Sequence, residues 1–170
     1  SRVPLNRRPV AIDYPPVKPQ PQPGEIAPRP LHYPTDIQPI FDRHCVSCHN
    51  EKKREGDLDL SGAMTELFCR SYENIIHKDM VPYIQEFIGP KPEGAEGMGY
   101  AAATPPYTYG SHKSKLIAVL RAGHYDVKLP REDFVRLATW VDANAPYYGS
   151  YFGRRNLAYR DRPDFRPVPT

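Results

Sequence analysis

The sequence predicts an all-α domain of three to four helices, with long loops between them and extended proline-rich segments at both termini. Apolar residues recur at helical spacing in several stretches, and no stretch shows the alternation of a strand. Prolines gather at the ends, since residues 1–40 hold 11 of the 21 and residues 161–170 hold three. With 170 residues and a hydrophobic fraction of 39%, the chain suits a single domain with a modest core.

The two ends of the chain differ from its middle. We expect residues 1–30 to form a proline-rich linker or extended arm, residues 31–152 the folded domain, and residues 153–170 a basic, proline-containing tail. Residues 1–30 carry five Lys/Arg against two Asp/Glu, as do residues 151–170, whereas the residues between carry 13 against 16. A nucleic-acid-binding domain needs basic charge on its folded part, so no nucleic acid is expected as a partner. No apolar run approaches the roughly 20 residues of a membrane helix, so no membrane span is expected.

The first helix is predicted over residues 35–49. Thr35 and Gln38 are spaced as a capping box, and Pro39 falls in the first turn, where its missing N–H costs little. The residues that share one face of this helix are Ile37, Ile40, Phe41, His44, Cys45 and Cys48. The helix should end at Cys48 and His49, before a polar loop over residues 50–59.

The remaining elements follow from periodicity and from helix stop signals. A second helix is predicted over residues 67–76, and residues 77–110 are expected to be irregular because they hold five prolines and five glycines. A third helix should be capped by Ser111 and ended by Gly123. Pro130 suits the first turn of a last helix, which should stop around Asn144.

The sequence Cys45-Val46-Ser47-Cys48-His49 has the Cys-X-X-Cys-His pattern that attaches haem in c-type cytochromes. Two thiols one helical turn apart can both form thioethers with the vinyl groups on one edge of a porphyrin. The adjacent His49 can then place its imidazole under the ring as one axial ligand of the iron. The motif therefore predicts one covalent haem c, held by Cys45 and Cys48 with His49 as the proximal ligand.

Two other uses of these cysteines compete with haem attachment. A zinc-binding structural module would use Cys45, Cys48, Cys69 and His77, a spacing within the loose range of zinc clusters. It leaves His49 unexplained. A thioredoxin-like dithiol would need a βαβ surrounding, which the pattern does not show. The third cysteine, Cys69, is expected to be a buried, unreactive thiol.

A second axial ligand would separate an electron carrier from a catalyst with an open site. His124 is the preferred candidate, because it stands in a short connection just before the last helix, which should pack on the motif helix. His112 and Met98 are the alternatives, together with an open site or an outside ligand. Four tyrosines from the long loop and the distal turn are expected to line the haem pocket: Tyr100, Tyr107, Tyr109 and Tyr125.

Longer stretches resemble a known family. These are residues 36–49 with the motif, Gly56-Asp57-Leu58-Asp59-Leu60, residues 109–116, Gly123-His124-Tyr125-Asp126-Val127 and residues 140–149. Over residues 30–152 the sequence resembles the cytochrome c domain of proteins related to the hydrazine synthase alpha subunit and, more distantly, planctomycete-type cytochrome c domains. The resemblance implies a class I cytochrome c-like fold. It also places His124 on the distal face, where the wider group often has a Met-Pro segment, so the haem would be bis-histidine. Serine is more usual than Cys69 at its position.

The expected function is transfer of single electrons by one low-potential haem, because bis-imidazole ligation lacks the methionine that raises the potential. The partner would be a redox protein or a neighbouring domain of the same natural chain; in the family such domains follow other domains. Lys52, Lys53 and Arg54 could steer an acidic partner, but the acidic residues around them favour a plain solvated loop. The alternative is a haem enzyme, peroxidase-like or hydrazine synthase-like, with an open distal site. Thioether attachment happens outside the cytoplasm, so a periplasmic or secreted protein is expected, with its signal sequence and other domains upstream of Ser1.

Overall fold

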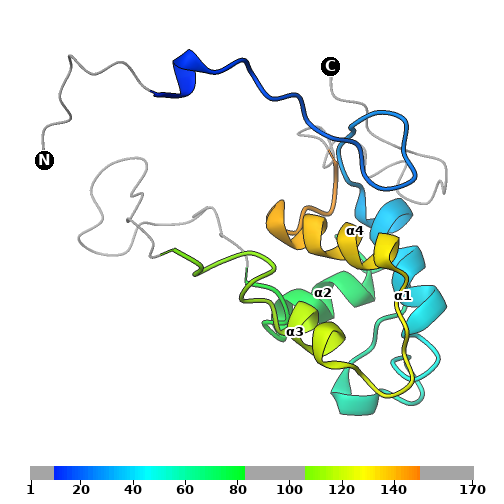
Figure 1. Cartoon of the computed structure of the whole chain (residues 1–170). Coiled ribbons are helices and arrows are strands. Elements are labelled where there is room, and N and C mark those ends of the chain that lie inside the picture. Colours follow the sequence, from blue (N-terminus) through cyan, green and yellow to red (C-terminus); the bar gives the residue numbers. More distant parts are fainter. Residues whose placement is uncertain (1–9, 83–105, 150–170) are drawn as a thin grey trace, which may run out of the picture.

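The computed structural model describes residues 10–82 and 106–149, and its described part is helical (Figure 1). Within these residues no strand forms, and the only β-type pairs are two isolated bridges, Met64 with Cys69 and His124 with Val127. The prediction of an all-α fold is confirmed. The helical elements are η1 (Val10–Asp13), η2 (Tyr33–Ile37), α1 (Gln38–His44), η3 (Glu55–Asp57), α2 (Arg70–His77), α3 (Lys115–Ala122) and α4 (Arg131–Asp142).

The first helical segment begins and ends earlier than predicted. A π-helical turn, η2, starts at Tyr33 and continues into α1, which carries Pro39 in its first turn. The capping box is wrong, because the backbone N–H of Thr35 already donates to the His32 carbonyl at 3.2 Å. The Gln38 side chain instead turns inward and donates to the Leu60 carbonyl at 3.0 Å. The helix ends at His44, so Cys45 to His49 lie in the turn that follows it and not in its last turn.

The other three helices lie close to their predicted places. The α2 helix begins at Arg70 and not at residue 67. Ser114, and not Ser111, caps α3, since its Oγ accepts from the Ile117 N–H at 3.2 Å and donates to the Met80 carbonyl at 3.0 Å. Gly123 ends α3 with a φ of 88°, in a region that favours glycine. The α4 helix follows Pro130 and ends at Asp142, as expected.

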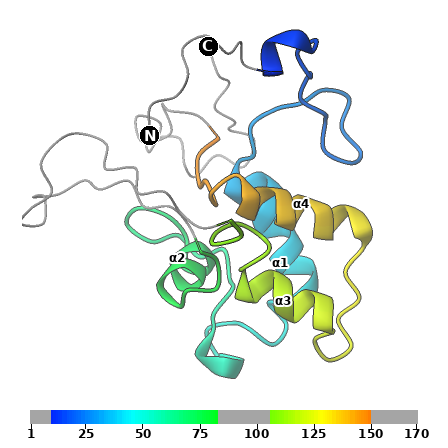
Figure 2. The same ribbon diagram turned by 60° about the vertical axis from the view of Figure 1, so that its left-hand side comes forward.

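The core is aromatic and lies where η2, α1, α2 and α4 meet (Figure 2). The ring of Tyr33 is fully buried and has four aromatic neighbours with centroid distances from 5.0 to 6.3 Å: Phe41, Tyr72, Trp140 and Tyr147. Its hydroxyl donates to Ser71 Oγ at 2.9 Å, and Ser71 in turn donates to Gln38 Oε1. Because every buried hydroxyl in this chain of contacts has a partner, the polar network ties α1 to α2 without leaving an unsatisfied hydroxyl in the core.

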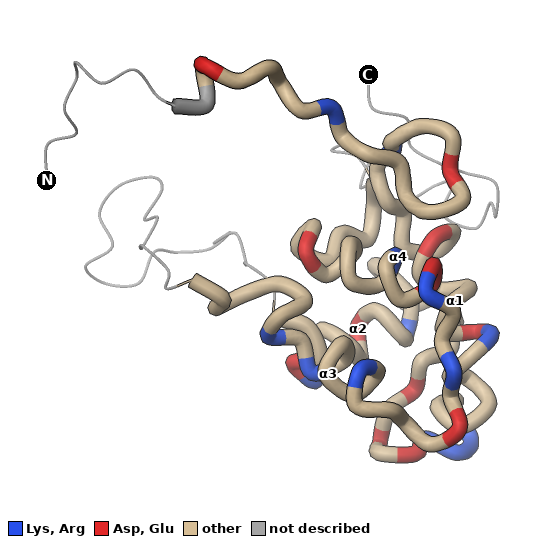
Figure 3. The backbone as a smooth tube through the Cα atoms, in the orientation of Figure 1, with Lys and Arg blue, Asp and Glu red and all other residues tan. Residues whose placement is uncertain are grey.

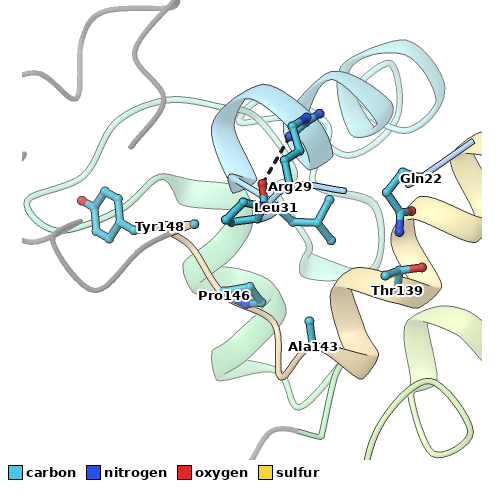
Figure 4. Close-up of a pocket in the computed structure, with 9 residues that line it drawn as sticks. Gln22, Arg29, Leu31, Thr139, Ala143, Pro146 and Tyr148 are labelled. Atoms are coloured by element: carbon cyan, nitrogen blue, oxygen red, sulfur yellow. Dashed lines mark hydrogen bonds between the residues drawn. The ribbon is translucent and has the colours of Figure 1, made fainter. Parts of the chain in front are cut away.

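The proline-rich arm is more closely held than a free linker. From Tyr14 to Pro21 it is exposed and runs away from the helices (Figure 1). Beyond Pro21 it returns and is fixed by charge: Arg29 binds both carboxylate oxygens of Asp36, at 2.8 and 2.9 Å, and Arg136 of α4 binds Glu25 at 2.9 Å. The arm and the end of α4 border an open cavity of about 300 Å³, lined by Gln22, Leu31, Thr139, Pro146 and Tyr148 among others (Figure 4). The expected tail, residues 153–170, lies outside the described residues.

Candidate functional site

The Cys-X-X-Cys-His motif forms a single turn directly after α1. Its backbone closes on itself, since the N–H groups of Cys48 and His49 both donate to the Cys45 carbonyl, at 3.1 and 2.9 Å. The N–H of Cys45 donates back to the Phe41 carbonyl at 2.8 Å, which joins the turn to the core helix. The spacing between Cys45 and Cys48 is therefore set by this turn and not by a continuous helix.

The two thiols of the motif differ in their surroundings. Cys45 is partly buried and packs against the hydrophobic core, whereas Cys48 is exposed. Burial raises the pKa of the Cys45 thiol to about 11, because a thiolate would lose its hydration there. Cys45 thus faces an apolar environment, whereas Cys48 faces solvent.

His49 and His124 lie next to each other, although 75 positions separate them in the sequence. Their ring centroids are 5.9 Å apart and their planes differ by 22°. His124 reaches this place in the connection between α3 and α4, directly after Gly123, and the N–H of Val127 donates to its carbonyl at 3.1 Å. That hydrogen bond closes the connection into a tight turn around His124.

The distance between the two imidazoles is compatible with direct ring contact and with a shared metal. Offset ring pairs have centroids about 4.5 to 7 Å apart, so 5.9 Å lies within the range of direct contact. Two metal–imidazole bonds of about 2 Å each, with the offset from nitrogen to ring centre on both sides, would also give a centroid distance of about 6 Å. His49 Nδ1 is also buried without a hydrogen-bond partner among the described residues. The donor set brought together here, two thiols in the motif and two neighbouring imidazoles, is the one that would hold a haem c.

The carboxylate of Asp133 joins α1, which precedes the motif turn, to α4, which follows His124. Asp133, in the first turn of α4, accepts from Arg43 Nη2 at 3.1 Å on both of its oxygens. Its Oδ2 also lies 3.1 Å from His44 Nε2. The sequence did not predict a role for Asp133 or Arg43, and it placed His44 only on the shared face of the first helix. An acidic residue early in a helix was the available signal, but it does not indicate which side chain it pairs with.

The remaining predicted residues are divided between the site and other places. Tyr125 packs edge-on against His124, with centroids 4.9 Å apart, although 89% of its surface is exposed. Tyr107 packs instead on His112 at 4.8 Å, and His112 is exposed; Tyr109 is 39% exposed. Tyr100 and Met98 lie outside the described residues. Of the described candidates, His124 is the one that has a ring contact with His49.

The structure does not assemble the zinc alternative. Cys69 is buried, with its sulfur 3.3 Å from Ser71 Oγ, whereas Cys48 and His77 are exposed. Among residues 10–82 and 106–149, no three His, Cys, Asp or Glu side chains converge as a group able to hold a metal ion. A two-histidine arrangement across a porphyrin needs no such group, because the porphyrin supplies the other ligands.

Comparison with protein-family models, with curated proteins and with solved structures finds no match for this chain. In addition, none of the helices in the described residues is long and apolar enough to cross a membrane.

Proposed function

We propose that this chain is an electron-transfer domain that carries one covalent c-type haem. Cys45 and Cys48 form the two thioethers, and His49 and His124 are the axial ligands. The observation that carries the proposal is the pairing of His49, from the motif, with a histidine from a distant turn at a centroid distance of 5.9 Å. A haem bound in this way supplies a one-electron couple, and bis-imidazole ligation keeps its potential below that of a Met/His cytochrome.

Each residue of the site has a separate task in this proposal. Cys45 and Cys48 anchor the haem by covalent bonds, so the haem does not dissociate from the chain. His49 and His124 occupy both axial positions, so no site remains for a peroxide or another substrate. The half-buried side chains of Leu58, Leu120 and Leu129, which pack against the core, come from the segments that flank these ligands and exclude water from the site.

Attachment of haem is tested by expressing the chain in a periplasm that contains the cytochrome c maturation machinery. We expect a Soret band and a denaturation-resistant haem on the wild-type chain. The double variant Cys45→Ser/Cys48→Ser should lose both, while the matched variant Cys69→Ser, with a cysteine outside the motif, should keep them. A wild-type chain without covalent haem would overturn the proposal.

The spin state separates the electron carrier from the haem enzyme considered above. With both axial positions filled, the resting protein should be six-coordinate and low-spin in both oxidation states. A five-coordinate, high-spin resting spectrum would contradict the ligation by His124 and would support a catalytic, open site.

A further inference from the structure

Basic charge in the described residues is concentrated in one segment. Residues 106–131 carry five Lys/Arg and one Asp/Glu, whereas residues 31–82 carry six against nine and residues 132–149 one against three. The segment consists of α3 and the two connections that flank it, and Figure 3 shows Lys and Arg along this helix. The folded domain is thus polarised, although its middle as a whole is acidic.

Within residues 10–82 and 106–149, no ion pair uses any of the five cations of this segment. All of them are exposed: Lys113, Lys115, Arg121, Lys128 and Arg131. The ion pairs among the described residues use other cations, namely Arg29, Arg43, His44, Arg70, Lys78 and Arg136. Asp126 is the one acidic residue of the segment, and the adjoining Lys78 and Asp79 contribute one charge of each sign. Among the described residues, the positive charge of this surface is therefore not compensated by an ion pair and is available to a partner.

Exposed apolar side chains accompany these charges. Val119 is 39% exposed on α3, and Tyr107 and Tyr125 are 72% and 89% exposed in the connections before and after it. Apolar and aromatic contacts surrounded by charge are typical of protein–protein interfaces.

The same segment carries His124. The α3 helix ends at Ala122, and His124 follows after one glycine, so a partner seated on α3 lies beside the proposed distal ligand. From these observations we infer that α3 and its flanking connections form a docking surface for an acidic protein, whose carboxylates surround an apolar spot that receives Val119. The docking surface itself is inferred from the charges of the described residues. The use of this surface for electron exchange close to His124 rests on the proposed function.

A protein partner fits this surface better than a nucleic acid or a lipid bilayer. The cations lie on a helix of eight residues and on its two connections, a span suited to one small protein patch. The middle of the domain is acidic overall, which repels an extended polyanion or a charged membrane once it reaches beyond this patch.

The test measures binding of the full chain to a plant-type ferredoxin, used as a small acidic probe protein, by titration calorimetry and by NMR shift mapping. We expect weak binding that falls at least about tenfold between about 20 mM and about 300 mM salt, with shifts confined to residues 106–131 and their neighbours. Lys113→Glu/Lys115→Glu should weaken binding by a further factor of about ten or more at low salt. The matched control Lys52→Glu/Lys53→Glu, with the same charge change in the loop after the motif, should have a small effect.

The outcomes separate this inference from the haem proposal. If the control pair weakens binding as much as the α3 pair, or if binding is insensitive to salt, the docking surface is refuted. Equal or tighter binding of phosphatidylglycerol vesicles or of a single-stranded oligonucleotide, lost in the α3 variant, would also overturn the choice of a protein partner. Neither readout requires a haem signal, so absence of a Soret band refutes the proposed function alone.

Discussion

His44 at the end of α1 contacts Asp133 at the start of α4, and the atoms Nε2 and Oδ2 lie 3.1 Å apart. The motif turn begins at the next residue after His44, and the distal turn with His124 ends shortly before Asp133. Arg43 strengthens the link by donating to the same carboxylate. This junction holds the two halves of the site in position relative to each other, so Asp133 is a positioning residue.

Replacement of Asp133 by Asn should therefore loosen both the fold and the site. We expect a loss of about 1 kcal/mol in the free energy of unfolding, because the pair is only partly shielded from solvent. Chemical denaturation of the haem-loaded chain measures this loss. Glu132→Gln is the matched control, since it removes the same charge from the same helical turn but has no partner among the described ion pairs. Equal losses in the two variants would assign the effect to the helix terminus and not to the junction.

Replacement of His124 by Ala should convert a low-spin haem into a high-spin one, or allow an outside ligand to bind. The reason is the position of its ring opposite His49. Absorbance and electron paramagnetic resonance report the change. His112→Ala serves as the control, because His112 is exposed and contacts Tyr107; its spectrum should remain that of the wild type. An unchanged low-spin spectrum in His124→Ala would exclude this residue as a ligand.

Periodicity and stop signals were enough to predict the fold class and the places of the helices. Gly123 ends α3 and Pro130 precedes α4, as predicted, because the backbone preferences of glycine and proline act on the adjacent residues. The start of the first helix and the cap of α3 were wrong for a common reason. Gln38 and Ser114 each satisfy a distant carbonyl, of Leu60 and Met80 respectively, and such tertiary contacts leave no trace in local spacing.

The candidate site, like the fold, was predictable where local spacing determines the structure and less so where tertiary packing does. The motif identified Cys45, Cys48 and His49, because their spacing encodes their chemistry. The pairing of His124 with His49 depended on how α4 packs, and the two rings do lie side by side. Three of the four tyrosines are described, and of these only Tyr125 contacts His124, the preferred distal ligand; Tyr107 contacts His112, the alternative. The composition of a loop cannot specify which ring a side chain meets. For the same reason, the packing of the arm through Arg29 was not foreseen.

Alkaline pH should destabilise the fold through Cys69. Burial raises the pKa of this thiol, so the folded state keeps its proton at a pH where the unfolded chain has begun to lose it. Stability is then full below the thiol's ordinary pKa, near 9, and falls as the pH rises above it. Denaturation midpoints of wild type and Cys69→Ala between about pH 7 and about pH 10 test this. The variant should lose less stability over this range; parallel curves would contradict the role of Cys69.

The buried carboxylate of Asp36 should contribute most to the attachment of the proline-rich arm. Its side chain is 1% exposed, binds Arg29 through both oxygens and accepts from the His32 N–H at 2.7 Å. Asp36→Asn keeps the shape but leaves the Arg29 charge with weaker compensation, so we expect a loss of about 3 kcal/mol in unfolding free energy. Limited proteolysis should then cut between residues 23 and 30, where the wild type resists.

The control for this prediction is Asp57→Asn, which removes a carboxylate from the exposed pair with Lys78. Because that pair lies in solvent and away from the arm, the control should leave both the unfolding free energy and the proteolysis pattern unchanged. If the arm of Asp36→Asn remained protected, the attachment would reside in the contact of Arg136 with Glu25, and the assignment to Asp36 would be wrong.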